Sequence, residues 1–322
     1  MKNKLKSKKY MIFGIMLLLL TGCGLHQKTI RFGAAGIGGM YDAFANAYVS
    51  IANKEENGLK LETKNTAGSA ANIRLLSGRY IELGIAQADL VEEAYSGTGE
   101  FKDEAYQGYQ AVANLYPEAC QIVVLSDSDI ESTEDLLGKR ISIGEAESGT
   151  ERNAKQILSA LGMNNGMVEM VNLDYTKAAA ELADGEIDAF FCTAGIKTNV
   201  IEELAKESGI RLLDIGEDCR NRLLAAYPSY SFYTVPADTY TGQSEDVETL
   251  CVQAVLLASE KLSEDTVKLL TELLFVHEKD IRYAASINLS EKEEDAVNGI
   301  TIPFHKGAAA YYAEHGIEVK TE

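Results

Sequence analysis

The sequence is poor in the residues that most metal and redox sites need. Its 322 residues include no Trp, four Pro, four His and five Cys. No two cysteines have the CxxC spacing, so zinc and thioredoxin-type chemistry have no support. His277 lies in an apolar helical pattern, and His305 and His315 have no metal-ligating residues in their company. We therefore predict neither a metal site nor a cofactor.

Motifs for nucleotide binding and for hydrolysis are also missing. GIGGMY, at residues 36–41, departs from GxGxxG because Tyr41 stands at the third glycine position. The sequence contains no GxxxxGKS or GxxxxGKT loop and no GxSxG turn. An enzyme needs a nucleophile or a base with partners. Since no such set stands out, we predict that the protein is not an enzyme.

Positive charge is scarce as well. Lys and Arg number 30 against 49 Asp and Glu, which gives a formal charge of −19. Binding to nucleic acid and electrostatic docking on anionic lipid both need basic residues, so this balance disfavours them. Hydrophobic residues make up 46% and charged residues 25%, as in globular proteins, and the length suggests two domains.

The N-terminus carries export signals. Five lysines within residues 2–9 precede an apolar run at 11–20, which is too short to span a bilayer and fits a signal peptide. Residues 20–23, Leu-Thr-Gly-Cys, resemble a bacterial lipobox. We predict a signal peptide at 1–22, a lipidated Cys23 and a tether at 23–29. An uncleaved anchor with an incidental cysteine is the alternative. Cleavage removes five lysines and no acid, which lowers the formal charge from −19 to −24.

The mature protein is therefore predicted to lie outside the cytoplasm, held by lipid at the outer face of the cell membrane or in the periplasm. Four cysteines remain beyond Cys23, and an exported protein can form disulfides. Two of them lie in apolar, strand-like runs, so we favour buried free thiols over a disulfide framework. The four are Cys120, Cys192, Cys219 and Cys251.

Strand-like and helix-like segments alternate along most of the chain, which predicts βαβ units and mainly parallel sheets. Apolar runs at 111–115 and 121–125 flank Tyr116 and Pro117, where we predict that the chain divides. Residues 230–235 resemble a strand that returns to the first unit. The remainder is predicted to be mostly helical, at 247–258, 264–277 and 308–314. The predicted lobes are 30–117 with 233–322, and 118–232.

Five predicted strand-to-helix turns combine small residues and hydroxyls, at 36–41, 67–72, 87–89, 147–151 and 192–195. Free N–H groups at helix starts favour anions, and ligands of such sheets bind at these turns. Glycine and serine also cap helices where no ligand binds. Thr150 is predicted to open the helix 151–161, either as a ligand donor or as its cap.

Eight segments in order carry a resemblance to a known family: FGAAGIGGMYDAFA (32–45), NTAGSAANIRLLSG (65–78), IELGIAQAD (81–89), ANLYPEACQIVV (113–124), DLLGKRISIGEAESGTERNAKQIL (135–158), DGEIDAFFCTAGI (184–196), VPADTYTGQSEDVETL (235–250) and IPFHKGAAAYY (302–312). The chain resembles the TAXI family of solute receptors associated with TRAP transporters. The resemblance implies an α/β type II periplasmic-binding-protein fold, with two lobes, a ligand cleft and a crossing-strand hinge. It also implies delivery of a small organic anion, a dicarboxylate such as glutamate or 2-oxoglutarate, to the TRAP membrane permease.

Positions that match the family's pocket motifs are Gly38, Gly39, Tyr41, Ser69, Asn72, Gln87, Asp89, Tyr116, Pro117, Ser148, Gly149, Thr150, Thr193, Ala194 and Gly195. These motifs contain no Arg, so a bound anion would depend mainly on neutral donors. Asp42 and Glu147 stand where the family has other residues, and such acids could pair with an amino group of the ligand, as in an amino acid. A lipoprotein that senses a ligand and docks on a membrane signalling receptor is the alternative function.

Overall fold

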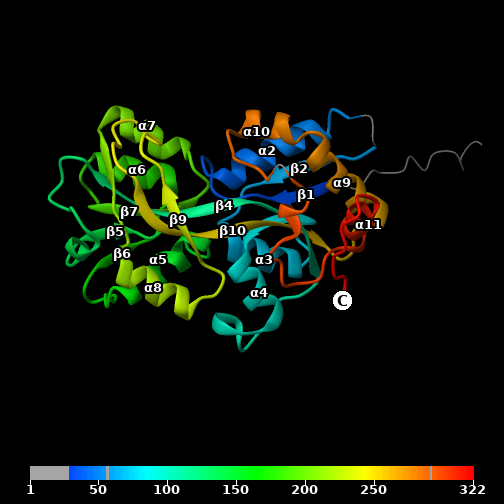
Figure 1. Ribbon diagram of the computed structural model, residues 1–322, viewed down its shortest axis with the longest axis horizontal. Coiled ribbons are helices and arrows are strands. Elements are labelled where there is room, and N and C mark those ends of the chain that lie inside the picture. The colour runs from blue at the N-terminus through cyan, green and yellow to red at the C-terminus, as the bar shows by residue number, and fades with distance from the viewer. Residues whose placement is uncertain (1–28, 56–57, 291) are drawn as a thin grey trace, which may run out of the picture.

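The computed structural model describes residues 29–55, 58–290 and 292–322 (Figure 1). The predicted signal peptide, Cys23 and all but the last residue of the predicted tether lie outside the described residues. Within the described part, no helix has the length and apolar character needed to cross a membrane.

Ten strands in the described part form one curled sheet, in the order β2-β1-β3-β10-β4-β7-β5-β6, with β8 beside β4 and β9 beside β10. The strands are β1 (Ile30–Gly33), β2 (Leu61–Lys64), β3 (Leu83–Gln87), β4 (Tyr109–Leu125), β5 (Arg140–Ser142), β6 (Glu169–Val171), β7 (Ala189–Ala194), β8 (Ile210–Leu212), β9 (Ser231–Val235) and β10 (Val247–Ser259). The α-helices are α2 (Met40–Ala52), α3 (Ser69–Ser77), α4 (Ala88–Ser96), α5 (Gly149–Ala160), α6 (Tyr175–Ala183), α7 (Asn199–Glu207), α8 (Glu217–Ala226), α9 (Glu264–Val276), α10 (Glu278–Ala285) and α11 (Lys306–Glu314).

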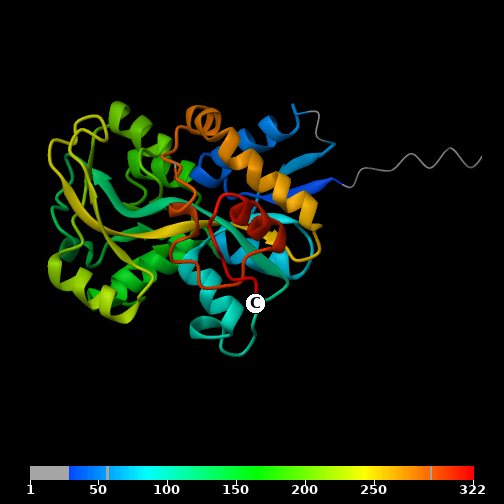
Figure 2. The same cartoon turned by 45° about the vertical axis from the view of Figure 1, so that its right-hand side comes forward.

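The elements gather into two lobes, each with helices on both faces of its part of the sheet (Figure 1). We call β1–β3, α2–α4 and α9–α11 the N-terminal lobe, and β5–β9 with α5–α8 the central lobe. The long strands β4 and β10 pair antiparallel and run through both. In Figure 2 the orange and red C-terminal helices pack against the blue and cyan start of the chain, so the C-terminal segment completes the N-terminal lobe.

This architecture confirms the predicted two-lobed α/β fold with crossing strands. The predicted lobe boundaries, 30–117 with 233–322 and 118–232, stay a prediction because β4 and β10 belong to both lobes. The four cysteines of the described part are buried and free, as predicted.

Two predictions are wrong, the mainly parallel pairing of the strands and the helix at 247–258. β10 pairs antiparallel with β3, β4 and β9, and β4 pairs antiparallel with β7 and β8. The apolar runs at 111–115 and 121–125 belong to one strand, β4, which continues through Tyr116 and Pro117. Pro117 lies opposite Gln253, directly beside a shift in the β10–β4 register, and such an irregularity tolerates a residue without an N–H.

The predicted helix at 247–258 is the strand β10. Most of its residues are buried, because β3, β4 and β9 pair with it. A strand buried on both faces loses its alternation of polar and apolar residues, so periodicity alone does not distinguish it from a buried helix.

Candidate functional site

A cavity lies between the two lobes, where strands of both lobes end and helices α2, α3, α5 and α6 begin. Its volume is about 50 Å³. One water needs about 10–15 Å³ by the same measure, so this closed arrangement has room for a small solute only. The lining residues are Ala35, Gly36, Ile37, Gly39, Met40, Tyr41, Ala67, Gly68, Ser69, Gln87, Glu118, Glu145, Ser148, Gly149, Thr150, Leu173, Asp174, Tyr175, Thr193 and Ala194.

Helices α2 and α5 bring main-chain N–H groups to this cavity from opposite lobes. Gly39 is the N-cap of α2 and provides no side-chain cap. At α5 the Ser148 hydroxyl accepts from the N–H of Glu151 at 3.0 Å, which leaves the N–H groups of Gly149 and Thr150 without an intrahelical acceptor. Ser148, not Thr150, is therefore the cap of α5, and the first turns of both helices are suited to a negatively charged group.

The Thr150 hydroxyl instead joins three elements of the central lobe. It lies 2.5 Å from the Tyr175 hydroxyl at the start of α6 and accepts from the N–H of Thr193, at the end of β7, at 3.3 Å. The Tyr175 hydroxyl donates to the Thr193 carbonyl at 3.0 Å. The side chains of Thr150 and Tyr175 and the main chain of Thr193 thus hold one wall of the cavity in a fixed arrangement.

Glu118 is an acid in the cavity wall that the predicted site did not include. Its side chain comes from the middle of β4 and is 2% exposed. The Tyr41 hydroxyl donates to its Oε2 at 2.7 Å. Burial raises the pKa of Glu118 to about 8, although the hydrogen bond from Tyr41 opposes the rise. The Glu118 carboxyl is therefore largely neutral near pH 7.

Two further acids, Glu145 and Asp174, line the cavity from the central lobe. Burial, with the charge of Asp174 as the next cause, raises the pKa of Glu145 above its ordinary value. The Asp174 carboxylate accepts from the N–H of Lys177 at 2.9 Å and so caps α6. Among the lining residues that the structure describes there is no Lys, Arg or His. The cavity wall is thus rich in acceptors and has no cationic side chain.

Gln87 closes the cavity at the end of β3. It is 2% exposed, and no described residue donates a hydrogen bond to its Oε1. Its amide lies against Gly149 of the other lobe, where a Cβ would stand 2.3 Å from the Gln87 Cδ. Glycine at position 149 therefore allows the lobes to approach this closely.

Asn72, predicted as a ligand contact, lies behind the cavity and does not line it. Its amide nitrogen donates to the carbonyls of Ala34 at 2.6 Å and Ile85 at 2.8 Å, and its Oδ1 accepts from the Thr66 hydroxyl at 2.8 Å. The side chain is fully buried. These bonds tie the ends of β1 and β3 together, so Asn72 shapes the wall and has no free group for a ligand.

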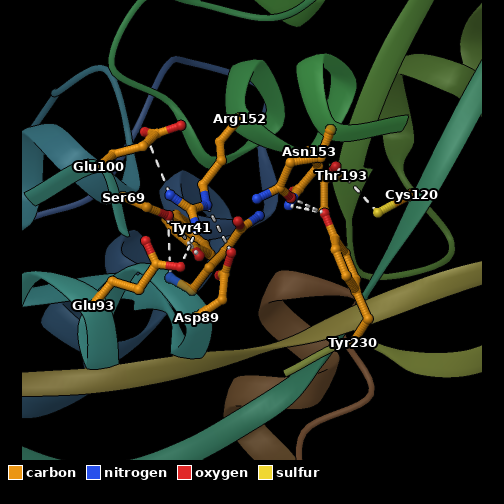
Figure 3. Close-up of polar contacts among 12 residues, drawn as sticks. Tyr41, Ser69, Asp89, Glu93, Glu100, Cys120, Arg152, Asn153, Thr193 and Tyr230 are labelled. Atoms are coloured by element: carbon orange, nitrogen blue, oxygen red, sulfur yellow. Dashed lines mark hydrogen bonds and ion pairs between the residues drawn. The ribbon is translucent and has the colours of Figure 1, made fainter. Parts of the chain in front are cut away.

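Asp89 is also placed outside the cavity wall, in an ion-pair cluster between the lobes (Figure 3). Arg152 of α5 contacts Asp89 at 3.1 Å and Glu93 at 2.7 Å, both on α4 of the other lobe, and Glu100 at 3.4 Å. Burial raises the pKa of Asp89, and the charge of Arg152 opposes that rise. The predicted ligand contact is thus a contact between lobes.

A second contact between the lobes occupies the start of α3. The main-chain carbonyl of Glu147 accepts from the N–H groups of Ala70 at 3.2 Å and Ala71 at 3.3 Å. The Glu147 carboxylate pairs with Arg74 at 2.5 Å. The turn at 67–72 therefore contributes the Ser69 side chain to the cavity, while its helix N–H groups are already bonded to the opposite lobe.

The remaining predicted residues lie beside the cavity without lining it: Gly38, Tyr116, Pro117 and Gly195. A Cβ on Gly195 would lie 3.2 Å from the Tyr116 ring, so these two pack against each other. Of the predicted set, the cavity brings together Gly39, Tyr41, Ser69, Gln87, Ser148, Gly149, Thr150, Thr193 and Ala194.

Comparison with known proteins identifies the family. Residues 32–316 match the NMT1-like family, and the chain therefore belongs to it. PhnD1 from Prochlorococcus marinus, solved in complex with methylphosphonate, is 12% identical, with a TM-score of 0.54 over 80% of this chain and 89% of that one. A binding protein component of an ABC phosphonate transporter from Pseudomonas aeruginosa is also 12% identical, with a TM-score of 0.50 over 84% of this chain and 83% of that one. The fold is thus the two-lobed fold of periplasmic binding proteins.

Proposed function

We propose that this member of the NMT1-like family is an extracytoplasmic receptor that captures a small organic solute between its lobes. The observation that carries the proposal is the cavity itself, which both lobes line with side chains and helix N–H groups. The PhnD1 structure holds methylphosphonate, so at least one protein with this fold binds a small solute. Among the described residues that line the cavity, no Ser or Thr hydroxyl is hydrogen-bonded to a His, Asp or Glu side chain, which favours a receptor over an enzyme.

The resemblance to the TAXI family supplies the finer part of the proposal. The solute is a small organic anion with one or two carboxylates, such as glutamate or 2-oxoglutarate, and it is delivered to a TRAP membrane permease. One carboxylate would bind at the first turns of α2 and α5, which come from opposite lobes. Such a bridge stabilises the closed arrangement, because only the closed form offers both sets of donors to one ligand.

The experiment is a melting screen with C4–C6 dicarboxylates and amino acids, followed by small-angle scattering with each hit. A ligand that binds only the folded protein raises the melting temperature, and bridging of the lobes reduces the radius of gyration. Gly149→Leu places a side chain in the cavity and should abolish both responses. Gly166→Leu, in an exposed loop of the same lobe, is the matched control and should keep them.

A wild type that responds to no member of the screen, or a Gly149→Leu variant that responds normally, contradicts the proposal.

The predicted lipid anchor is tested separately. Cys23→Ala should release the protein from the membrane or leave an unprocessed precursor, and unchanged lipid labelling of that variant contradicts lipidation at Cys23.

A further inference from the structure

We propose that the solute carries a protonated amino group and that Glu118 is the side chain that recognises it. This inference rests on the proposed function and specifies which of the small organic anions the cavity selects. The receptor function and this inference are separable, because a receptor for carboxylates without an amino group would agree with the proposed function and contradict the inference.

The charge of the wall is the first observation. Glu118, Glu145 and Asp174 line the cavity, while none of its described lining residues is Lys, Arg or His. Lys177 pairs with Asp174 at 3.5 Å from outside the lining, so a dianion such as 2-oxoglutarate would find no cationic side chain beside Glu118 among the described lining residues. An amino group reverses one of these unfavourable interactions, since it places a positive charge beside a carboxylate.

The second observation is the unused acceptor capacity of Glu118. Its Oε2 accepts from Tyr41 at 2.7 Å, and no described residue donates to its Oε1. In its ionised form a carboxylate has about four acceptor positions, of which Tyr41 occupies one. An ionised carboxylate at 2% exposure with a single donor is unfavourable. A donor from the solute would remove that penalty.

Gln87 provides an independent third observation. Its Oε1 is buried, lines the same cavity and has no hydrogen-bond donor among the described residues. An ammonium group has three N–H donors and no acceptor. Glu118 on β4 and Gln87 at the end of β3 thus both offer acceptors to the N–H donors of an ammonium group.

Binding of an amino group has a proton signature. Burial raises the pKa of Glu118 to about 8, so its carboxyl is largely protonated near pH 7 when no cation lies beside it. An ammonium beside the carboxyl stabilises its ionised form, and the Glu118 proton leaves to solvent as the ion pair forms. Binding therefore releases up to one proton near pH 7. A ligand that takes a hydrogen bond from neutral Glu118 releases none.

Most titratable groups around Glu118 do not contribute to this signal, and the Glu118→Gln variant separates the Glu118 proton from that of Glu145, whose pKa burial also raises. Burial raises the pKa of the nearby phenols and thiols, so they stay neutral near pH 7 before and after binding. Asp89 is already paired with Arg152. The groups concerned are Tyr41 on α2, Tyr116 and Cys120 on β4, Tyr175 on α6, Cys192 on β7, Cys251 on β10 and Asp89 on α4.

The test is calorimetry with pairs of ligands that differ at the amino group, glutamate against 2-oxoglutarate and aspartate against succinate, in buffers of different ionisation enthalpy. The wild type should bind the amino member of a pair roughly 10- to 150-fold more tightly, the range for a hydrogen bond to a charged group. It should also release a proton at pH 7. Glu118→Gln should reduce that preference by the same factor and abolish the proton release. Glu186 is an exposed acid of the central lobe, and Glu186→Gln should change neither.

Equal or tighter binding of the amino-free member, or tight binding of an amino acid without proton release, overturns the inference and leaves the receptor function intact. Absence of binding by every ligand of the wider screen overturns the receptor function itself. If Glu118→Gln fails to fold, the wild-type preference for the amino member of each pair, together with its proton release, still decides whether the solute carries an amino group.

Discussion

Arg152→Met is the change that most directly tests whether the ion-pair cluster holds the lobes together. Arg152 lies on α5 of the central lobe, its side chain is 5% exposed, and it contacts Asp89 at 3.1 Å and Glu93 at 2.7 Å on α4 of the N-terminal lobe. Methionine keeps most of the apolar stem and removes the charge. The substitution therefore keeps most of the packing of α5 and removes the cationic partner that the structure describes for the buried Asp89.

Removal of one partner from a buried ion pair costs about 3–5 kcal/mol, because the other charge stays buried without compensation. Asp89 is 6% exposed with the lobes closed, whereas opening of the lobes would hydrate it. Most of the cost therefore falls on the closed form and little on the open form. At about 3 kcal/mol, solute affinity should fall roughly 150-fold. The open form should unfold at nearly the wild-type temperature.

The assay combines calorimetry, with a solute identified by the melting screen, and small-angle scattering with and without it. Lys268→Met is the control, because it breaks the exposed Lys268–Glu314 pair within one lobe and should change affinity little. Arg152→Met with Asp89→Leu should recover much of the affinity, since an apolar pair replaces a buried ion pair at small cost. An Arg152→Met protein with wild-type affinity and normal compaction would refute the reasoning.

Three further predictions concern the cavity. The folded pKa of Glu118, about 8, exceeds its ordinary value of 4.5, so the folded protein binds more protons than the unfolded chain between these values. Stability of the ligand-free protein should therefore fall by up to about 1.4 kcal/mol per pH unit from about pH 5 to about pH 8, and urea unfolding of Glu118→Gln should not show this fall. Ser148→Ala removes the α5 cap that binds the Glu151 N–H and should cost about 1 kcal/mol in the same assay. Thr150→Val removes the hydroxyl that contacts Tyr175, and calorimetry should show solute binding weakened roughly tenfold, a loss that the Lys268→Met control should not share.

Much of the site could be predicted because it lies where predicted strands end and helices begin. Gly39, Ser148 and Gly149 stand at such turns, and all three line the cavity. Tyr175 stands at a turn of the same kind, after the strand β6, and Asp174 before it is a favourable N-cap. That signal was present in the sequence, and it identifies a cavity residue that the predicted set did not contain.

The contacts between the lobes could not be predicted in the same way. Asp89 and Arg152 are far apart in the sequence, as are Ala70 and Glu147, so no local period or spacing connects them. The sequence predicts Asp89 as a ligand contact from its place after a strand and from its match to the family's pocket motifs. The true partner depends on how α4 and α5 meet across the closed lobes, which is a property of the tertiary structure.

Glu118 shows what a sequence alone can still indicate about such a site. It is an acid within the long apolar strand β4, where it is buried, and a buried acid is unfavourable unless a partner compensates it. Tyr41 provides one hydrogen bond and no charge. Because the described wall around Glu118 offers no basic side chain, the compensation has to come from solvent, a proton or a solute. Closure of the lobes excludes solvent and a proton only neutralises the acid, so a cationic group on the solute is the partner that makes a buried carboxylate favourable in the closed form.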